Sequence, residues 1–98
     1  ITENGMASDD KVVVGRVADT QRQGFMRRHF EAVDGAIRAG VDVRGYYVWS
    51  LMDNFEWAFG YERRFGLVHV DYASQQRTPK DSALALQAFL AQRRAGQT

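Results

Sequence analysis

Apolar side chains recur at helical spacing between residues 20 and 39. Four of them lie three or four positions apart on one helical face: Met26, Phe30, Val33 and Ile37. Asp19 precedes this stretch and is a residue type favoured at a helix N-cap. Gly40 follows it, where a glycine commonly ends a helix. The pattern therefore predicts a helix over residues 20–39.

The pattern changes after residue 40. Residues 41–49 place apolar and aromatic side chains next to one another without clean alternation, which is typical of a strand buried on both faces of a parallel sheet. At the start of the chain, residues 1–2 have the character of a strand end, and the turn signal Asn4-Gly5 follows almost directly. A strand, a helix and a strand in this order predict a right-handed βαβ unit if the two strands are neighbours.

The last third of the chain predicts a short strand and a second helix. Residues 67–72 alternate apolar with other side chains and are expected to be extended. Thr78 and Pro79 suit the N-cap and the first position of a helix that runs to about Arg94. Two strands and two helices do not close a parallel sheet, so the pattern indicates two βα units that belong to something larger.

Composition limits the function more than it defines it. The chain has 98 residues, 45% of them hydrophobic and 26% charged, which are values of one small globular domain. The net charge of +1 argues against nucleic-acid or anionic-membrane partners. No stretch approaches the roughly 20 apolar residues of a membrane span. Without cysteine and with two isolated histidines, no metal and no other cofactor is expected.

The richest candidate chemistry lies at residues 49–57, which read WSLMDNFEW. A sugar ring has apolar C–H faces that pack on an indole, and an ionised carboxylate has two oxygens that can accept from neighbouring hydroxyls. Trp49, Glu56 and Trp57 are therefore candidate sugar-binding residues, with core packing as the alternative for the tryptophans. Asp53 and Asn54 are expected to brace the loop through hydrogen bonds to backbone.

A second candidate carboxylate is Glu3, which follows a strand end and precedes a turn. Phe65 fits a core position and a pocket wall about equally well. Arg64 is expected to be a loop cation with a structural ion pair. His69 alternates with apolar neighbours and is expected to face solvent or a polar partner.

These motifs together resemble glycoside hydrolase family 1, and bacterial β-glucosidases in particular. The strings that carry the resemblance are ITENG at 1–5, GYYVWSLMDNFEW at 45–57, GY at 60–61, RFGL at 64–67 and RTPKDS at 77–82. The resemblance implies an α/β fold in which residues 1–98 form the C-terminal part of a single (β/α)8 TIM-barrel domain. This part would run from the end of the seventh strand through the eighth βα unit.

The resemblance also implies a role for each candidate residue. Glu3 matches the catalytic nucleophile, and Trp49 matches the aromatic platform beneath the sugar. Glu56 and Trp57 match the residues that hold the hydroxyls of the glycone, and Phe65 matches a wall of the same pocket. In the family, the peptide bond that corresponds to Trp49-Ser50 is cis.

The implied activity is that of a retaining β-glycosidase, which releases terminal β-D-glucosyl residues from β-glucosides or cello-oligosaccharides by double displacement. The family's acid/base carboxylate lies in a Thr-Asn-Glu-Pro-like motif that these 98 residues do not contain. The remainder of the barrel, or a complementing chain, is expected to supply it, and the chain alone is expected to be inactive. The alternative is an inactive carbohydrate-binding or structural barrel fragment. A bacterial, cytoplasmic location accompanies the resemblance.

Overall fold

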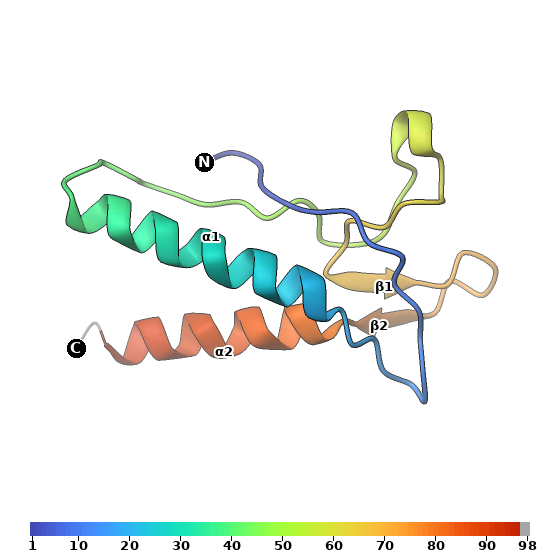
Figure 1. The fold of residues 1–98 in the computed structure, drawn as a ribbon. Helices are drawn as coiled ribbons and strands as arrows, with labels where there is room; N and C mark the ends of the chain where they lie inside the picture. Colours follow the sequence, from blue (N-terminus) through green and yellow to red (C-terminus); the bar gives the residue numbers. More distant parts are fainter. Residues whose placement is uncertain (97–98) are drawn as a thin grey trace.

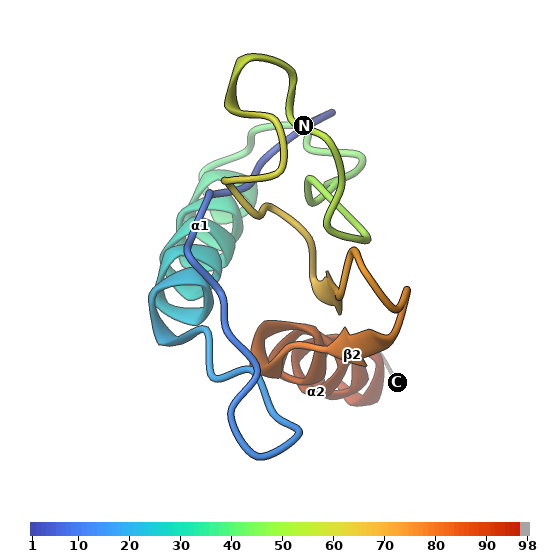
Figure 2. The same ribbon diagram turned by 90° about the vertical axis from the view of Figure 1, so that its right-hand side faces the viewer.

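Two helices lie side by side in the computed structural model, and extended segments cover one side of them (Figures 1 and 2). The structure describes residues 1–96; Gln97 and Thr98, which the one-domain prediction includes, lie outside the described residues. The elements in chain order are α1 (Thr20–Arg38), the 3-10 helix η1 (Trp57–Phe59), β1 (Val68–Val70), β2 (Arg77–Pro79) and α2 (Asp81–Ala95). Both α-helices run in the same direction, and the chain returns between them through segment 41–49 (Figure 1).

Helix α1 confirms the prediction from apolar spacing. Asp19 precedes its first residue, and Gly40 follows its C-cap with a φ of 96°, a conformation that favours glycine. The Asp19 side chain makes no capping hydrogen bond. It accepts instead from the Arg22 guanidinium at 2.7 Å and from the backbone N–H of Ser82 at 2.8 Å. Asp19 therefore joins the starts of the two helices.

Aromatic rings connect the two helices to the extended segment above them. The ring of Phe30 in α1 stacks on Phe89 in α2 with centroids 4.8 Å apart. The edge of Tyr46 meets the same Phe30 ring at 5.3 Å. An ion pair between Arg93 and Asp34 closes the far end of the helix pair at 2.6 Å. These contacts position segment 41–49 over the helices.

The strand predicted at residues 41–49 is wrong in extent, but this segment does pair with the start of the chain, as a βαβ unit requires. Along this segment the structure describes one β-bridge, in which Val48 pairs in parallel with Asn4. The Asn4 N–H donates to Tyr47 O at 3.0 Å, and the Trp49 N–H donates to Asn4 O at 2.8 Å. The ladder is short because a strand needs backbone partners along its edges, and segment 1–4 offers few.

The predicted start of the second helix at Thr78 and Pro79 is wrong. Both residues belong to β2, which pairs antiparallel with β1 so that Thr78 faces His69. Proline is tolerated at this strand end, and its fixed φ suits extended as well as helical backbone. The Lys80 N–H donates to Leu67 O at 2.8 Å and prolongs the pairing, so α2 begins only at Asp81.

Polar and charged side chains occupy much of the interior. The buried apolar side chains are Val17, Met26, Leu67 and Val70, whereas eight polar or charged residues are buried, Lys80 and Ser82 completely. Among residues 1–96, no helix is long and apolar enough to cross a membrane.

Candidate active site

The start of the chain and the segment before the WSLMDNFEW motif lie next to each other. Glu3 is exposed and precedes Asn4, whose backbone is hydrogen-bonded to Tyr47 and Trp49. A Cβ at Gly5 would lie 2.1 Å from the carbonyl oxygen of Trp49, so this approach requires glycine. Glu3 therefore lies two positions before a residue that is in direct contact with the Trp49 backbone.

A side-chain hydrogen bond strengthens the same junction. The Tyr46 hydroxyl donates to the Asn4 side-chain oxygen. Burial raises the pKa of the Tyr46 hydroxyl, so it keeps the proton that it donates. Asn4 thus holds segment 46–49 through both its backbone and its side chain, and Glu3 is the residue directly before this contact.

The Trp49 indole N–H donates to Glu56 Oε1 at 2.8 Å. Trp49 is 41% exposed, and Glu56 is half-buried. The hydrogen bond orients the carboxylate and uses one of its two oxygens. The backbone N–H of Glu56 also donates to Gly60 O at 2.7 Å, which folds the loop around η1. The peptide bond between Trp49 and Ser50 is cis, as the family resemblance implies.

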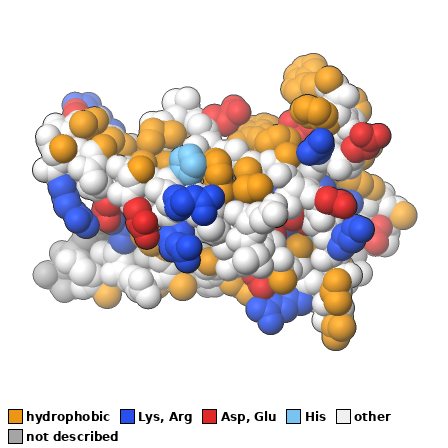
Figure 3. All heavy atoms as spheres, viewed as in Figure 1, with side chains coloured by type: hydrophobic (Ala, Val, Ile, Leu, Met, Phe, Trp, Pro, Cys, Tyr) orange, Lys and Arg blue, Asp and Glu red, His pale blue; other side chains and the backbone are white. Residues whose placement is uncertain are grey.

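Exposed apolar side chains gather on the loop that carries η1. Trp57 is 86% exposed, and the orange surface at the upper right of Figure 3 corresponds to this loop. The other large exposed side chains of the loop are Phe55, Phe59 and Tyr61. Trp57 is therefore not a core residue within residues 1–96, which was the alternative prediction for this tryptophan. An exposed aromatic patch of this kind marks a binding or packing surface.

Phe65 stands where the loop returns to the body of the molecule. Its side chain is half-buried, and its carbonyl oxygen accepts from the Ser50 N–H at 3.1 Å. One hydrogen bond thus joins the side chains of Trp49 and Glu56. Trp57 and Phe65 belong to the same loop, but within residues 1–96 their side chains make no hydrogen bond to Trp49 or Glu56.

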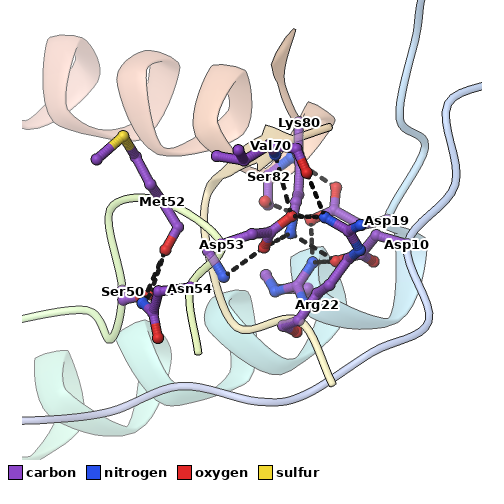
Figure 4. Close-up of polar contacts among 12 residues, drawn as sticks. Asp10, Asp19, Arg22, Ser50, Met52, Asp53, Asn54, Val70, Lys80 and Ser82 are labelled. Carbon is purple, nitrogen blue, oxygen red and sulfur yellow. Dashed lines mark hydrogen bonds and ion pairs between the residues drawn. The ribbon is translucent and has the colours of Figure 1, made fainter. Parts of the chain in front are cut away.

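Asp53 and Asn54 brace the loop, as predicted. Asp53 Oδ1 accepts from the Gly66 N–H at 3.0 Å, and Asp53 Oδ2 accepts from the Val70 N–H at 3.3 Å. The Asn54 side-chain amide donates to Met52 O at 3.0 Å (Figure 4). These bonds connect the motif to the strand that follows the loop.

A buried network of charges lies directly beneath the loop, and sequence reasoning missed it (Figure 4). Lys80 Nζ lies 2.7 Å from Asp53 and 2.6 Å from Asp10, and the side chains of all three are at most 2% exposed. Arg22 extends the network with ion pairs of 2.7 Å to both Asp10 and Asp19. Apart from Arg22 and Asp19, which are three residues apart, the partners are distant in sequence, so no local pattern could have revealed those pairs.

Arg64 completes this network and confirms its predicted structural pairing. Its guanidinium lies 2.7 Å from Asp53 Oδ2 and donates to Val70 O at 2.8 Å. Burial alone would raise the pKa of the Asp53 carboxyl, but the hydrogen bonds and charges of Lys80 and Arg64 outweigh it and hold that pKa below its usual value. Asp53 is therefore an ionised structural group and is unsuited to donating a proton.

His69 differs from its expected environment. It is 7% exposed, and its Nδ1 has no hydrogen-bond partner in the part of the chain that the structure describes. Burial, followed by the positive charge of Arg64, lowers the pKa of the imidazole. The expectation of solvent or a polar partner is wrong, because the fold buries His69 at the middle of β1, away from solvent.

In residues 1–96, no group of three or more histidine, cysteine, aspartate or glutamate side chains is arranged to hold a metal ion. The three buried aspartates of the network face cations instead. What the geometry does assemble is an exposed carboxylate at one segment end, next to a tryptophan, a second carboxylate and an aromatic loop. Aromatic faces and carboxylates are two kinds of surface that a sugar ring can contact.

The comparison with known families identifies the class of protein. The model of glycosyl hydrolase family 1 matches residues 1–95, and the chain belongs to this family. It is 58% identical over 96 residues to a bifunctional β-D-glucosidase/β-D-fucosidase of Bifidobacterium breve, which covers 93% of this chain and 21% of that protein. It is 54% identical to β-glucosidase A of Thermotoga maritima over 84% of this chain and 19% of that protein.

Solved structures give the same result. The family 1 β-glucosidase of Exiguobacterium antarcticum B7 superposes with a TM-score of 0.95 at 44% identity, covering 97% of this chain and 21% of that one. These structural neighbours are TIM-barrel enzymes, so the α/β barrel class is confirmed. The chain spans about a fifth of the length of the curated relatives it matches.

Proposed function

We propose that this chain is the C-terminal part of a retaining β-glycosidase, from the end of the seventh barrel strand through the eighth βα unit. Residues 1–98 then belong to one TIM-barrel domain. The parallel bridge between Asn4 and Val48 supports this assignment, because α1 connects the two paired segments as a barrel helix would. The candidate residues follow the ends of these segments, and barrel enzymes place their active sites at that end of the strands.

In the proposed reaction, the Glu3 carboxylate attacks the anomeric carbon of a terminal β-glucosyl residue. The bond to the leaving group breaks, and a carboxylic acid outside this chain protonates the departing oxygen. The resulting glycosyl ester on Glu3 is then hydrolysed by a water that the same outside carboxylate deprotonates. Exposure suits Glu3 to this role, since a nucleophile must be able to reach the substrate.

The observation that carries the proposal is the Trp49–Glu56 hydrogen bond beside the segment of Glu3. It places an aromatic face and a fixed carboxylate together, and these are the two surfaces that a pyranose needs. Trp57 would contribute its exposed indole to the glycone, and Phe65 a wall. Curated relatives carry the names β-glucosidase and 1,4-β-D-glucan glucohydrolase, which favours β-glucosides and cello-oligosaccharides as substrates.

Glu56 narrows the substrate further. A carboxylate that accepts from glycone hydroxyls would repel a phosphate on the 6-position of the sugar. We therefore expect the enzyme to act on plain β-glucosides, or on close relatives such as β-galactosides and β-fucosides, and to discriminate against 6-phospho-β-glucosides.

The partner of this chain would be the remainder of the barrel. Large apolar side chains are exposed on both helices, including Ile37, Leu84 and Leu90, and on the extended segment at Val41 and Tyr47. Surfaces of this kind pack against further protein. The acid/base carboxylate would come from the same missing part, so we expect no turnover by the 98 residues alone.

The alternative is a carbohydrate-binding or structural fragment without activity, and the family relatives do not favour it. The test is hydrolysis by the complete enzyme of a 4-nitrophenyl β-glucoside and its 6-phospho analogue. We expect the plain glucoside to be the better substrate and Glu3→Gln to remove turnover of both. Retained turnover in Glu3→Gln would refute the nucleophile, and faster cleavage of the phosphorylated substrate would refute the role of Glu56. The bacterial, cytoplasmic location stays a prediction of the resemblance.

A further inference from the structure

The two ends of the loop that carries Glu56, Trp57 and Phe65 meet at one side chain. Asp53 immediately precedes loop 54–65, and Asp53 Oδ1 accepts from the N–H of Gly66, which immediately follows it. A Cβ on Gly66 would lie 2.3 Å from the backbone nitrogen of Asp53, so the two ends are in direct contact. Asp53 therefore closes the base of the whole loop.

Asp53 is itself anchored from below. Its side chain is 0% exposed, and its oxygens lie 2.7 Å from both Lys80 and Arg64. Lys80 comes from the entrance of α2, and its ammonium also reaches Asp10 at 2.6 Å (Figure 4). The base of the loop is thus tied to the helix and to the segment after Glu3.

The base of the loop is also hydrogen-bonded to Ser50, the residue that follows Trp49. The Ser50 N–H donates to Phe65 O, and the Leu67 N–H donates to Ser50 O at 2.9 Å. Ser50 follows Trp49 directly, so Trp49 lies next to the hydrogen-bonded base from which the loop with Glu56 extends. The 2.8 Å bond between the indole and the Glu56 carboxylate depends on this arrangement.

We propose that Asp53 is a positioning residue for the glycone site, which sets Glu56 against Trp49 by joining the two ends of loop 54–65 and tying them to Lys80. This proposal rests on the proposed function, since it assumes that Glu56 accepts from glycone hydroxyls and that the 6-hydroxyl is one of them. Asp53 is not a catalytic residue, because both oxygens of its buried carboxylate accept hydrogen bonds from protein groups and are not available to substrate.

The proposal predicts a change in selectivity as well as in stability. In Asp53→Asn, the new amide group donates where the carboxylate accepted, so it opposes Lys80, Arg64 or the Gly66 N–H. The base loosens and Glu56 leaves its place beside Trp49. Hydroxyl contacts that strengthen in the transition state are then lost. A substrate without the 6-hydroxyl loses less, because it never used that contact.

The experiment compares kcat/KM of the complete enzyme for 4-nitrophenyl β-glucoside and its 6-deoxy analogue. The matched control is Asp19→Asn, because Asp19 is an equally buried carboxylate of the same network that binds Arg22 and Ser82. Its own side chain does not touch the loop, and its partner Arg22 reaches the loop at the Arg64 carbonyl oxygen, away from Asp53 and Gly66. We expect both variants to lower Tm. The ratio of kcat/KM for glucoside over 6-deoxyglucoside should fall about fivefold or more in Asp53→Asn and stay within about twofold of wild type in Asp19→Asn.

Arg64→Lys is measured in parallel, so that the result does not depend on the folding of Asp53→Asn. It keeps the charge but replaces the guanidinium, whose Nη1 donates to both Asp53 Oδ2 and Val70 O, with a shorter ammonium side chain, and a fall in the same ratio is expected. A ratio that stays at the wild-type value in folded Asp53→Asn, or in Arg64→Lys where Asp53→Asn is insoluble, would overturn the positioning role. A wild-type enzyme that cleaves neither substrate would instead overturn the proposed function.

Discussion

The indole N–H of Trp49 donates to Oε1 of Glu56 at 2.8 Å, across the loop that separates the two residues. The hydrogen bond gives the indole a second role besides offering its face to a sugar. It fixes the direction of a carboxylate that has two oxygens available for hydroxyls. Sequence reasoning paired an indole with a carboxylate as two independent sugar contacts, whereas the structure makes them one unit.

Replacing Trp49 with phenylalanine tests this unit. The phenyl ring keeps an aromatic face and loses the donor, so Glu56 loses its orientation. A hydrogen bond to a charged group contributes about 1.5–3 kcal/mol when well shielded and less where solvent reaches it, as it does here. We expect kcat/KM of the complete enzyme for an aryl β-glucoside to fall about tenfold.

The control is the same substitution in a Glu56→Ala background, which removes both carboxylate oxygens that could accept from the indole. If the donor acts through the Glu56 carboxylate, most of the effect of Trp49→Phe should disappear there, as in a double-mutant cycle. An undiminished effect in that background would show that the indole acts on its own.

A substitution in the turn at residues 13–16 is predicted to increase the stability of the protein. Val14 is 99% exposed with a φ of 52°, and Gly15 has a φ of 69°. The reciprocal hydrogen bonds between Val13 and Arg16 make this a two-residue hairpin turn that favours Asn-Gly. Left-handed backbone costs a β-branched residue roughly 1–2 kcal/mol, so Val14→Asn should raise the free energy of unfolding by about 1 kcal/mol.

Chemical unfolding of the complete enzyme measures this gain. Val13→Asn is the matched control, since Val13 is also exposed but does not have a positive φ. It should give no gain. Equal stabilisation by both substitutions would attribute the effect to surface polarity and not to the backbone.

His69 predicts a specific loss of stability at mildly acidic pH. Its folded-state pKa is lowered, so between that value and the unfolded pKa of about 6.5 the unfolded chain binds the extra proton. Neutral His69 therefore stabilises the folded state relative to the unfolded state fully above about pH 6.5. This stabilisation is lost as the pH falls through that value toward the folded pKa. Tm measured from pH 8 to pH 5 should show the decline.

His69→Gln should flatten part of that decline, whereas His29→Gln, at the other histidine of the chain, should leave it in place. The groups that act on the His69 imidazole are Arg64 and Lys80, which lower its pKa, and Asp53 and Asp10, which oppose them. Identical pH profiles for wild type and His69→Gln would contradict the assignment.

The sequence predicted the features that depend on neighbouring residues. Apolar spacing located α1, and the unusual density of Trp49, Glu56 and Trp57 marked the site. The bracing roles of Asp53 and Asn54 followed from their known preference for backbone partners. Local pattern made Glu3 a candidate carboxylate, and the family motifs assigned it the role of nucleophile.

Long-range pairing could not be predicted in the same way. Lys80 joins Asp10 across 70 positions, and no periodicity encodes that contact. Thr78 and Pro79 suit a helix start and a strand end equally well, and the pairing of β2 with β1 decides between them. The covering of His69 likewise depends on which segments the fold places beside β1.

The central claim is that Glu3 is the nucleophile of a retaining β-glycosidase. A 2-deoxy-2-fluoro-β-glucoside with a good leaving group forms a glycosyl-enzyme whose hydrolysis is slow, because the fluorine destabilises the cationic transition state. Intact mass followed by peptide mapping of the complete enzyme locates the trapped sugar.

We predict one fluoroglucosyl group on the peptide that contains Glu3, and none in Glu3→Gln. The 98-residue chain alone should remain unlabelled, because the acid/base group and the rest of the pocket lie outside it. An adduct on a different residue, or no adduct on a complete enzyme that still hydrolyses β-glucosides, would contradict the account.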